Sequence, residues 1–194
     1  VTFTITVKMI SVTQLVNPGF EDADGTDDKK ALGWTLTGST RKEENPHSGK
    51  WAAHFYNANE TTAAVKQTIK GLEKGVYIFG GYIEGEKADA DAVVTIYDKD
   101  GNKKGDTLKV SCSLDGWMNW KNPEVTGIVI SEGDYLEVGM EVAVQAGGWG
   151  TMDDFYLYSA YEYDILVDNQ VKNGTISCSA AKSLSGEKIT VTAT

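Results

Sequence analysis

One short stretch of the sequence, residues 147–158, combines residue types that could bind a ligand with residue types that could bind a metal ion. Trp149 is enclosed by glycines, which interrupt regular structure, so we expect it on a loop with its ring exposed. Asp153 and Asp154 follow directly, and carboxylate oxygens are ligands that calcium prefers. The stretch therefore suggests two kinds of chemistry, aromatic stacking and calcium binding.

The direction in which Asp153 points follows from the strand-like run after it. Side chains of a strand alternate between two faces, which would put Asp153 on the same face as Phe155 and Leu157. We therefore expect Asp153 to point inward, where an unpaired carboxylate is costly and a bound cation would remove that cost. In the alternative reading, Asp153 and Asp154 only hydrate the end of a loop.

The composition excludes several classes of partner. The chain has 194 residues, of which 41% are hydrophobic and 24% charged, which is ordinary for a soluble globular protein. Its formal net charge of −10 argues against nucleic acid, whose phosphates attract a basic surface. The sequence holds no apolar run long enough to cross a membrane, so we expect no membrane insertion.

The division of the chain follows from its strand patterns. Roughly ten short alternating segments, separated by turns and without an amphipathic helix, predict an all-β fold, an antiparallel β-sandwich with Greek-key or jelly-roll connections. In one such segment Leu136, Val138, Met140 and Val142 would face inward. We assign residues 13–160 to this sandwich.

The two ends of the chain have different patterns. Residues 1–12 read as a linker or an edge strand from a preceding module, and residues 161–194 as a partial β domain too short to build a core of its own. The sequence begins with Val1 and contains no signal-peptide pattern, so we interpret the chain as a piece of a larger, multimodular protein. Cys112 and Cys178 are expected to be unpaired, half-buried strand residues, with a disulfide as the alternative.

Two predicted strands carry polar and aromatic side chains on the face that would point away from the core. His54 and Tyr56 share such a face in one strand, and Tyr82 and Glu84 share one in another. If the two strands are neighbours, these four side chains make one patch on the outside of a sheet, with Asn57 just beyond it. The alternative is an ordinary half-solvated sheet face, where tyrosine is favoured by its β propensity.

The five tryptophans differ in their expected roles. Trp34 and Trp51 have the strand parity of core residues, and Trp117, which follows a glycine at a strand start, is expected to be packed. Trp120 could be packed or exposed. Trp149 is the strongest candidate for stacking on a ligand, because its glycine neighbours cannot cover it.

Catalytic and zinc chemistry find little support. His47 and His54 have no third ligand nearby in the sequence, and no nucleophile elbow or phosphate-binding glycine loop is present. The acidic pairs at 43–44 and at 89 and 91 could suggest a glycosidase, but nothing apolar surrounds them that would raise a pKa. We expect no enzyme activity.

The ordered motifs resemble those of a known family. They are Asn-Pro-Gly-Phe-Glu at 17–21, Gly-Trp at 33–34, His-Ser-Gly-Lys-Trp-Ala-Ala-His-Phe at 47–55, Gly-Val-Tyr at 75–77, Gly-Trp at 116–117, and Trp149 to Phe155. Together they resemble carbohydrate-binding modules of the galactose-binding-like jelly-roll type, in particular the family 61 modules of bacterial arabinogalactan endo-β-1,4-galactanases. The C-terminal fragment resembles a bacterial immunoglobulin-like repeat.

The resemblance implies a structural calcium ion. Its side-chain ligands would be Glu21 and Asp153, and carbonyl groups near Gly19 and Lys50 would supply backbone oxygens. Calcium takes six to eight oxygen ligands, so carboxylates and turn carbonyls suit it.

The resemblance also implies a function. We expect a non-catalytic module that tethers a secreted or cell-surface bacterial glycoside hydrolase, through covalently linked neighbouring modules, to β-1,4-galactan or a related galactose-containing polysaccharide. Its sugar-binding residues would be Trp149 and Tyr56 for stacking, and His54, Asn57, Tyr82 and Glu84 for hydrogen bonds, with Trp120 as a further contact. An adhesion or structural module is the main alternative, and a glycan-hydrolysing domain is the third.

Overall fold

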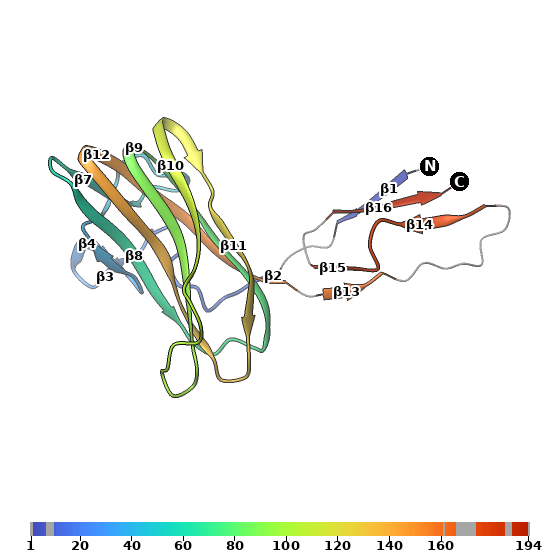
Figure 1. Cartoon of the computed structure of the whole chain (residues 1–194). Helices are drawn as coiled ribbons and strands as arrows, with labels where there is room; N and C mark the ends of the chain where they lie inside the picture. The colour runs from blue at the N-terminus through green and yellow to red at the C-terminus, as the bar shows by residue number, and fades with distance from the viewer. Residues whose placement is uncertain (1, 7–9, 161, 166–173, 185–187, 194) are drawn as a thin grey trace.

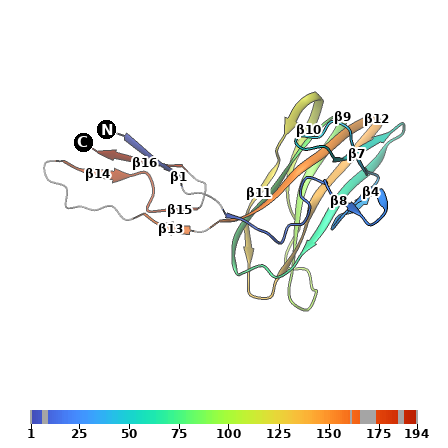
Figure 2. The ribbon, with the colours of Figure 1, turned by 180° about the vertical axis from the view of Figure 1, so that it is seen from behind.

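The protein is all-β, as the sequence predicted. The computed structural model describes residues 2–6, 10–160, 162–165, 174–184 and 188–193, and the regular elements in these ranges are all β-strands. Figures 1 and 2 show a broad sandwich and, beyond one end of it, a small group of paired strands. No helix that could cross a membrane occurs in the described ranges.

The sandwich is a nine-stranded antiparallel sheet that folds over on itself to make two layers (Figure 1). Two long strands, β9 (Gly75–Tyr97) and β12 (Tyr135–Ala160), run through both layers and pair with each other, with a register shift between Val144 and Trp149. The halves of β9 and β12 on either side of that shift pair with different sets of shorter strands. On one side β12 pairs with β8 (Thr61–Ile69), which pairs in turn with β5 (Thr35–Thr37), and β9 pairs with β10 (Leu108–Lys121), which continues a few residues past the shift. On the other side β12 pairs with β2 (Ile10–Ser11) and with β7 (Ala52–Asn57), β7 pairs with β6 (Thr40–Lys42), and β9 pairs with β11 (Glu124–Ile130).

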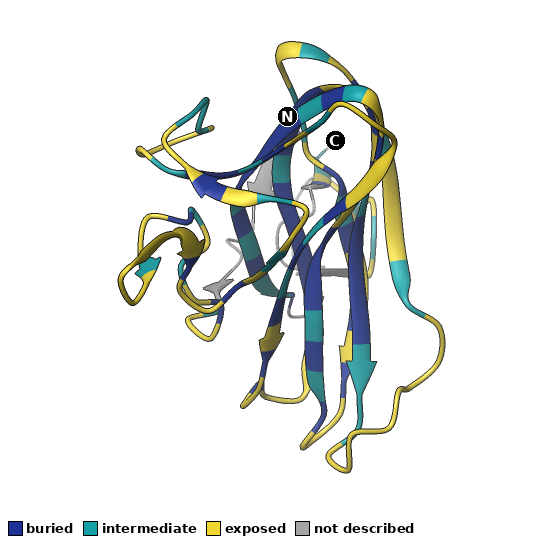
Figure 3. Cartoon of the chain, turned by 90° about the vertical axis from the view of Figure 1, so that its left-hand side faces the viewer, coloured by how far each residue is buried: buried dark blue, intermediate teal, exposed yellow. Residues whose placement is uncertain are grey.

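The core lies between the two layers and follows the alternation of the sequence. Leu136, Val138 and Met140 have no exposed surface, and their cross-strand neighbours Val65 and Val94 have none either. Figure 3 shows buried residues running along the paired strands while exposed residues gather in the loops. The predicted inward face of 134–142 is therefore confirmed.

A β-bulge at Asp154 changes which way β12 faces. Asp153 pairs with Tyr82 and Tyr156 pairs with Gly80, so one extra residue stands on β12, and Asp154 adopts a left-handed conformation with φ of 44°. The bulge shifts the alternation by one position, so Met152 and Phe155 both reach the core. Asp153 therefore lies on the outer face of the sheet with Trp149, and the prediction that it shares a face with Phe155 and Leu157 is wrong.

Trp149 is part of a strand, not of a loop. It belongs to β12 and pairs with Tyr56 on one side and Glu86 on the other. The glycines on either side let other groups approach closely: a Cβ at Gly150 would lie 2.3 Å from the Phe55 ring. The Gly-rich sequence therefore marks close packing around a strand, and the loop prediction is corrected.

A buried arginine organises the loop that precedes the sandwich strands. Arg41 lies in β6 and is only 5% exposed, and its guanidinium donates hydrogen bonds to the carbonyls of Phe20, Glu21 and Asp28. The same guanidinium lies 3.6 Å from the centre of the Trp51 ring. Trp34 is buried as predicted, whereas Trp51 is half-buried beneath this arginine rather than within the core. The loop itself carries the short hairpin of β3 (Ala23–Asp24) and β4 (Asp27–Ala31).

The N-terminal strand pairs with the C-terminal part of the chain. β1 (Thr2–Thr6) is antiparallel to β16 (Lys188–Ala193), which also pairs with β14 (Ile176–Cys178), while β13 (Glu162–Asp164) pairs with β15 (Lys182–Leu184). Part of the segment predicted as a linker, residues 2–6, thus shares a sheet with the C-terminal fragment. Cys112 and Cys178 are both free and half-buried in strands, as expected.

Candidate functional site

Two exposed aromatic side chains, Tyr56 and Trp117, and the half-buried Trp149, which was expected to be exposed, gather around one hollow. The rings of Trp117 and Trp149 lie 6.0 Å apart at an angle of 45°, and Tyr56, the cross-strand partner of Trp149, is 62% exposed. The hollow has a volume of about 370 Å³. We call it the tryptophan hollow; it is lined by Lys42, Glu44, Asn45, His54, Tyr56, Trp117 and Trp149.

Two different structural features bring the tryptophans together. Trp149 is fixed by its position in β12, whereas Trp117 lies where β10 leaves the regular register, between Gly116 and Lys121. Gly116 and Met118 both have positive φ values, 133° and 58°, which turn this part of β10 out of the sheet. Trp117 is 58% exposed as a result, so the prediction that it is packed is wrong.

The rim of the tryptophan hollow is polar. His54 Nε2 lies 3.7 Å from Glu44 Oε1, and Glu44 also pairs with Lys42. Burial lowers the pKa of His54, an effect that the Glu44 carboxylate partly offsets. A neutral imidazole at ordinary pH can both donate and accept hydrogen bonds, which suits the recognition of hydroxyl groups. Lys42, Glu44 and Asn45 were not among the predicted site residues, because the end of β6 and the loop that follows it come close to Trp149 only in the folded chain.

The predicted four-residue patch is divided in two by β12. His54 and Tyr56 lie on β7 and Tyr82 and Glu84 on β9, and β12 pairs with both strands between them. His54 and Tyr56 line the tryptophan hollow, and Tyr82 does not. Asn57 lies opposite Gly148 and accepts a hydrogen bond from the backbone of its own turn, so its side chain does not line the hollow either.

Glu84 lies under the aromatic surface and not on it. Its side chain is fully buried, and its Oε2 accepts a hydrogen bond from the backbone N–H of Met118. Among the described residues, Glu84 Oε1 and the hydroxyl of Thr151, its cross-strand neighbour, have no hydrogen-bond partner. Burial raises the pKa of Glu84. The expectation that Glu84 bonds directly to a sugar is therefore not met, and its contact with Met118 instead supports the turn that carries Trp117.

Tyr82 and Trp120, two further predicted residues, meet around His47. The rings of His47 and Tyr82 are stacked with their centres 3.9 Å apart, and the rings of His47 and Trp120 are nearly perpendicular with their centres 5.0 Å apart. His47 Nδ1 also lies 2.7 Å from Asp154 Oδ2. Tyr82 and Trp120 thus pack against His47, which belongs to the loop that covers Asp153, and neither lines the tryptophan hollow.

Asp153 is fully buried although it points to the outer side of the sheet. The loop of residues 43–50 covers it, and its Oδ2 accepts hydrogen bonds from the backbone N–H groups of His47 (2.8 Å) and Ser48 (3.1 Å). Burial raises the pKa of Asp153 to about 7, and the Asp154 carboxylate adds to this rise, while the N–H bonds oppose it. A buried carboxylate with a raised pKa is a group that a cation would stabilise.

The other predicted calcium ligands lie around the same place. A Cβ built at Gly19 would be 3.4 Å from Asp154 Oδ1, 3.6 Å from Asp153 Oδ1 and 3.9 Å from Glu21 Cγ, so three carboxylate side chains meet at this glycine. Glu21 Oε1 accepts hydrogen bonds from the backbone N–H groups of Lys50 and Trp51. Across the described ranges no three His, Cys, Asp or Glu side chains are close enough to bind a metal by themselves. The all-oxygen donor set fits calcium only if backbone carbonyls complete it.

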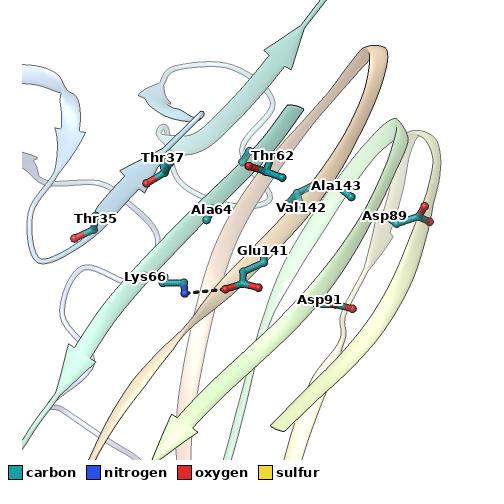
Figure 4. A pocket seen from close by; sticks show the side chains of 11 residues that line it. Thr35, Thr37, Thr62, Ala64, Lys66, Asp89, Asp91, Glu141, Val142 and Ala143 are labelled. Carbon is teal, nitrogen blue, oxygen red and sulfur yellow. Dashed lines mark ion pairs between the residues drawn. The ribbon is translucent and has the colours of Figure 1, made fainter. Parts of the chain in front are cut away.

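Another hollow of the sandwich has a different character. It has a volume of about 550 Å³ and lies on the outer side of β8, β9 and β12 (Figure 4). Its charged groups are already paired: Lys66 Nζ lies 2.7 Å from Glu141, and Asp91 is paired with Lys109 and Ser111. The rest of its lining consists of Asp89, which accepts a hydrogen bond from Ser113, and of Thr, Ala and Val side chains, and includes no aromatic ring. It lacks the groups that stack on sugars, so we place the site at the tryptophan hollow.

Comparisons with known proteins agree with this fold. The chain is similar to the solved structure of TmCBM61 in complex with β-1,4-galactotriose, at 29% sequence identity and a TM-score of 0.60, covering 77% of this chain and 99% of that one. It is also similar to the CBM22-1 xylan-binding domain of Paenibacillus barcinonensis Xyn10C, at 16% identity and a TM-score of 0.51, covering 79% of this chain and 96% of that one. No protein-family model and no curated protein matches the chain.

A similar sandwich also occurs in a protein with enzyme activity. The enzymatically active domain of tailspike protein 4 from bacteriophage CBA120 is 14% identical, with a TM-score of 0.58, and the match covers 74% of this chain but 21% of that one. At this identity the similarity concerns the fold alone. The tryptophan hollow of the present chain holds one carboxylate, Glu44, which forms an ion pair with Lys42.

Proposed function

The chain is a jelly-roll domain of the carbohydrate-binding-module type, and we propose that it binds β-1,4-galactan, or a related galactose-containing polysaccharide, at the tryptophan hollow without catalysing a reaction. The similarity to TmCBM61, a module solved with galactotriose, supports this choice of ligand. The observation that carries the proposal is the meeting of Trp117, Trp149 and Tyr56 around one open hollow.

The aromatic wall suits a pyranose ring. One face of galactose is a set of C–H bonds, and an indole ring matches it in size and polarity. The two indoles are inclined at 45°, so they present a bent surface and not a flat one. A bent surface of this kind would fit a polysaccharide chain in which successive sugar rings are rotated relative to one another. It would fit the flat surface of a crystalline glycan less well.

The rim supplies the polar part of recognition. Neutral His54, the Glu44 carboxylate and the Lys42 ammonium border the aromatic wall on one side, and Asn45 adds an amide. A few convergent polar groups beside an apolar wall are the usual composition of a small-molecule site. We propose that these groups bond to the hydroxyl groups of the stacked sugar.

We also propose that a calcium ion bound near Gly19 holds the site together. Asp153 and Glu21 would be its carboxylate ligands, with carbonyls near Gly19 and Lys50. The loop of residues 43–50 joins the two regions, since Asn45 lines the hollow while His47 and Ser48 bond to Asp153. When bound, the ion would balance the negative charge of the buried Asp153 carboxylate.

In a larger protein such a module would act as a tether. Reversible binding raises the effective concentration of an attached enzyme on its substrate without any new catalytic contact. We propose this role for a secreted or cell-surface protein of several linked modules.

Isothermal titration of the protein with β-1,4-galacto-oligosaccharides tests the proposal. We expect millimolar-to-micromolar binding that Trp149→Ala reduces by about tenfold or more, as truncation of a central aromatic contact does. Met118→Ala is the matched control, because Met118 is exposed beside Trp117 but does not line the hollow.

Two results would contradict the proposal. Absence of binding to a panel of galactans, xylans and glucans would favour an adhesion or structural module instead. Release of reducing ends from any of these glycans by the purified chain would show an enzyme.

A further inference from the structure

A second group of aromatic side chains lies further along β12, beyond the bulge at Asp154. Tyr156 and Tyr158 point to the same outer side as Trp149, and Tyr82 of β9 lies beside them. They border a hollow of about 410 Å³. We call it the tyrosine hollow; it is lined by Tyr82, Asn122, Glu124, Asp154, Phe155, Tyr156 and Tyr158.

The ring of Tyr156 is held in place from several directions. Its hydroxyl donates a hydrogen bond to Glu124 Oε2 (2.9 Å) and lies 2.8 Å from Asn122 Oδ1. The ring lies against Gly80, where a Cβ would be 2.5 Å from the ring carbon that carries the hydroxyl. Tyr158 is stacked on it, with ring centres 5.0 Å apart and planes 23° from parallel. A ring fixed in this way loses little freedom when a ligand binds to it.

Polar groups with unused hydrogen-bonding capacity border these rings. Within the part of the chain that the structure describes, Glu124 Oε1 and Asn122 Nδ2 have no hydrogen-bond partner, so one acceptor and one amide donor are left beside the rings. Stacked aromatics next to a carboxylate and an amide make the same combination of groups as the tryptophan hollow.

A comparison within the molecule separates this arrangement from ordinary sheet packing. Tyr97 and Tyr135 are also stacked, with ring centres 5.1 Å apart and planes 12° from parallel. They are direct cross-strand partners, as expected for residues that favour sheets, and none of the hollows described above is lined by them. The Tyr156–Tyr158 pair differs from it in facing a hollow with polar groups.

We propose that the tyrosine hollow is a second sugar-binding site, which takes a pyranose ring of the same polysaccharide. The proposal rests on the proposed function, since it needs a glycan-binding protein. Trp149 and Tyr156 lie on one face of the same strand, roughly 20 Å apart along it at about 3.3 Å per residue. A disaccharide would thus occupy one hollow at a time, whereas a long polysaccharide could contact both and gain affinity by multivalency.

The test is a titration with β-1,4-galactobiose, followed by nuclear magnetic resonance of the ¹⁵N-labelled chain. We expect two separate sets of shifts, one at the indole N–H groups of Trp117 and Trp149 and one at the backbone amides of residues 156–158. Trp149→Ala should abolish the first set and leave the second. Tyr158→Ala should do the reverse and weaken the second site by about tenfold or more.

Variants that preserve packing guard against misfolding as an explanation. Tyr158→Leu retains apolar bulk without the ring and should weaken the second site as Tyr158→Ala does, with an unchanged first set of shifts. Tyr156→Phe removes only the fixed hydroxyl and should weaken the second site less. Tyr135→Ala, which disturbs the other stacked pair, should leave both sets unchanged.

The outcomes separate the two proposals. If Trp149→Ala removes every shift, or if Tyr158→Leu binds like the wild type at residues 156–158, the second site is wrong and the proposed function stands. If the wild-type chain shows no shift with galactobiose or with longer galacto-oligosaccharides, both proposals fall together.

Discussion

The rings of Trp117 and Trp149 lie 6.0 Å apart at 45°, although neither strand segment pairs with the other at this point. Trp149 is held within β12, while Trp117 reaches it from a stretch of β10 that has left its register with β9. The wall of the site is thus made of one tryptophan fixed by sheet hydrogen bonds and one carried by a turn. Loss of either ring leaves the other without its neighbour.

Trp117→Ala should therefore weaken galacto-oligosaccharide binding about as much as Trp149→Ala, by about tenfold or more. The double variant should lose less than the sum of the two single losses, because both rings contact the same sugar surface; the coupling should exceed about 0.5 kcal/mol. Titration calorimetry of the four proteins measures this coupling. Strictly additive losses would mean that the two rings bind separate ligands.

Stability should fall in mildly acidic solution because of His54. Burial lowers the pKa of His54, so as pH falls the unfolded chain takes up a proton at about pH 6.5 while the folded chain does not. The free energy of unfolding should thus decrease from about pH 6.5 down to the lowered pKa, by up to about 1.4 kcal/mol per pH unit from this residue. Denaturant unfolding of the wild type and of His54→Gln, compared between pH 7.5 and 5, isolates this contribution.

The neighbouring carboxylate gives a second test of the same effect. Glu44 raises the pKa of His54 in the folded chain, so Glu44→Gln should lower that pKa further. The loss of stability should then continue to a lower pH and be larger in total. A wild-type profile that matches His54→Gln at every pH would contradict the effect.

Calcium should stabilise the chain if Asp153 and Glu21 bind it. At a free concentration about 100 times Kd, a bound ion raises the free energy of unfolding by about 2.7 kcal/mol. Thermal unfolding with calcium and with a chelator measures the difference, which Asp153→Asn and Glu21→Gln should abolish. Glu60→Gln, a change of the same charge at an exposed position, should retain it. Equal unfolding temperatures with calcium and with chelator in the wild type would reject the metal site.

Arg41 should be among the most sensitive polar positions of the fold. Arg41→Met keeps the apolar stem but leaves the carbonyls of Phe20, Glu21 and Asp28 without their donor, at a cost of about 2–4 kcal/mol. Arg41→Lys should recover only part of the loss, since one ammonium cannot reproduce the planar fork. Urea unfolding measures both, and Lys30→Met, at an exposed position of β4, serves as the control. A cost below about 0.5 kcal/mol, as at an ordinary surface position, would contradict this role.

The fold class and the core faces follow from the sequence because burial imposes them locally. Leu136, Val138 and Met140 alternate with polar residues, and only one face of a strand can enter the core. The hydrophobic effect thus fixes these faces whatever the partner strands are. The same local rule identified His54 and Tyr56 as outward-facing, and both do line the tryptophan hollow.

The parts of the site that the sequence did not reveal depend on non-local pairing. The alternation of polar and apolar residues does not show that β12 lies between β7 and β9. The prediction that Tyr82 lies next to Tyr56 assumed that β7 and β9 are neighbours. Nor does the alternation show that β10 leaves its register before Trp117. A glycine precedes Trp117 and Trp149, but it also precedes the buried Trp34, so this pattern alone could not have placed the two rings together.

The extra residue at Asp154 reverses which side chains of β12 point outward and which point into the core. Outward side chains have odd numbers up to Asp153 and even numbers from Tyr156 onward, so one strand keeps its aromatic rings outside and its phenylalanine inside across the change. A chain lacking residue 154 would exchange the two sets, driving Tyr156 and Tyr158 toward the core and Phe155 and Leu157 toward water. The fold therefore depends on the length of this strand as well as on its composition, and single-residue deletions beyond Asp153 should destabilise it far more than substitutions at exposed positions.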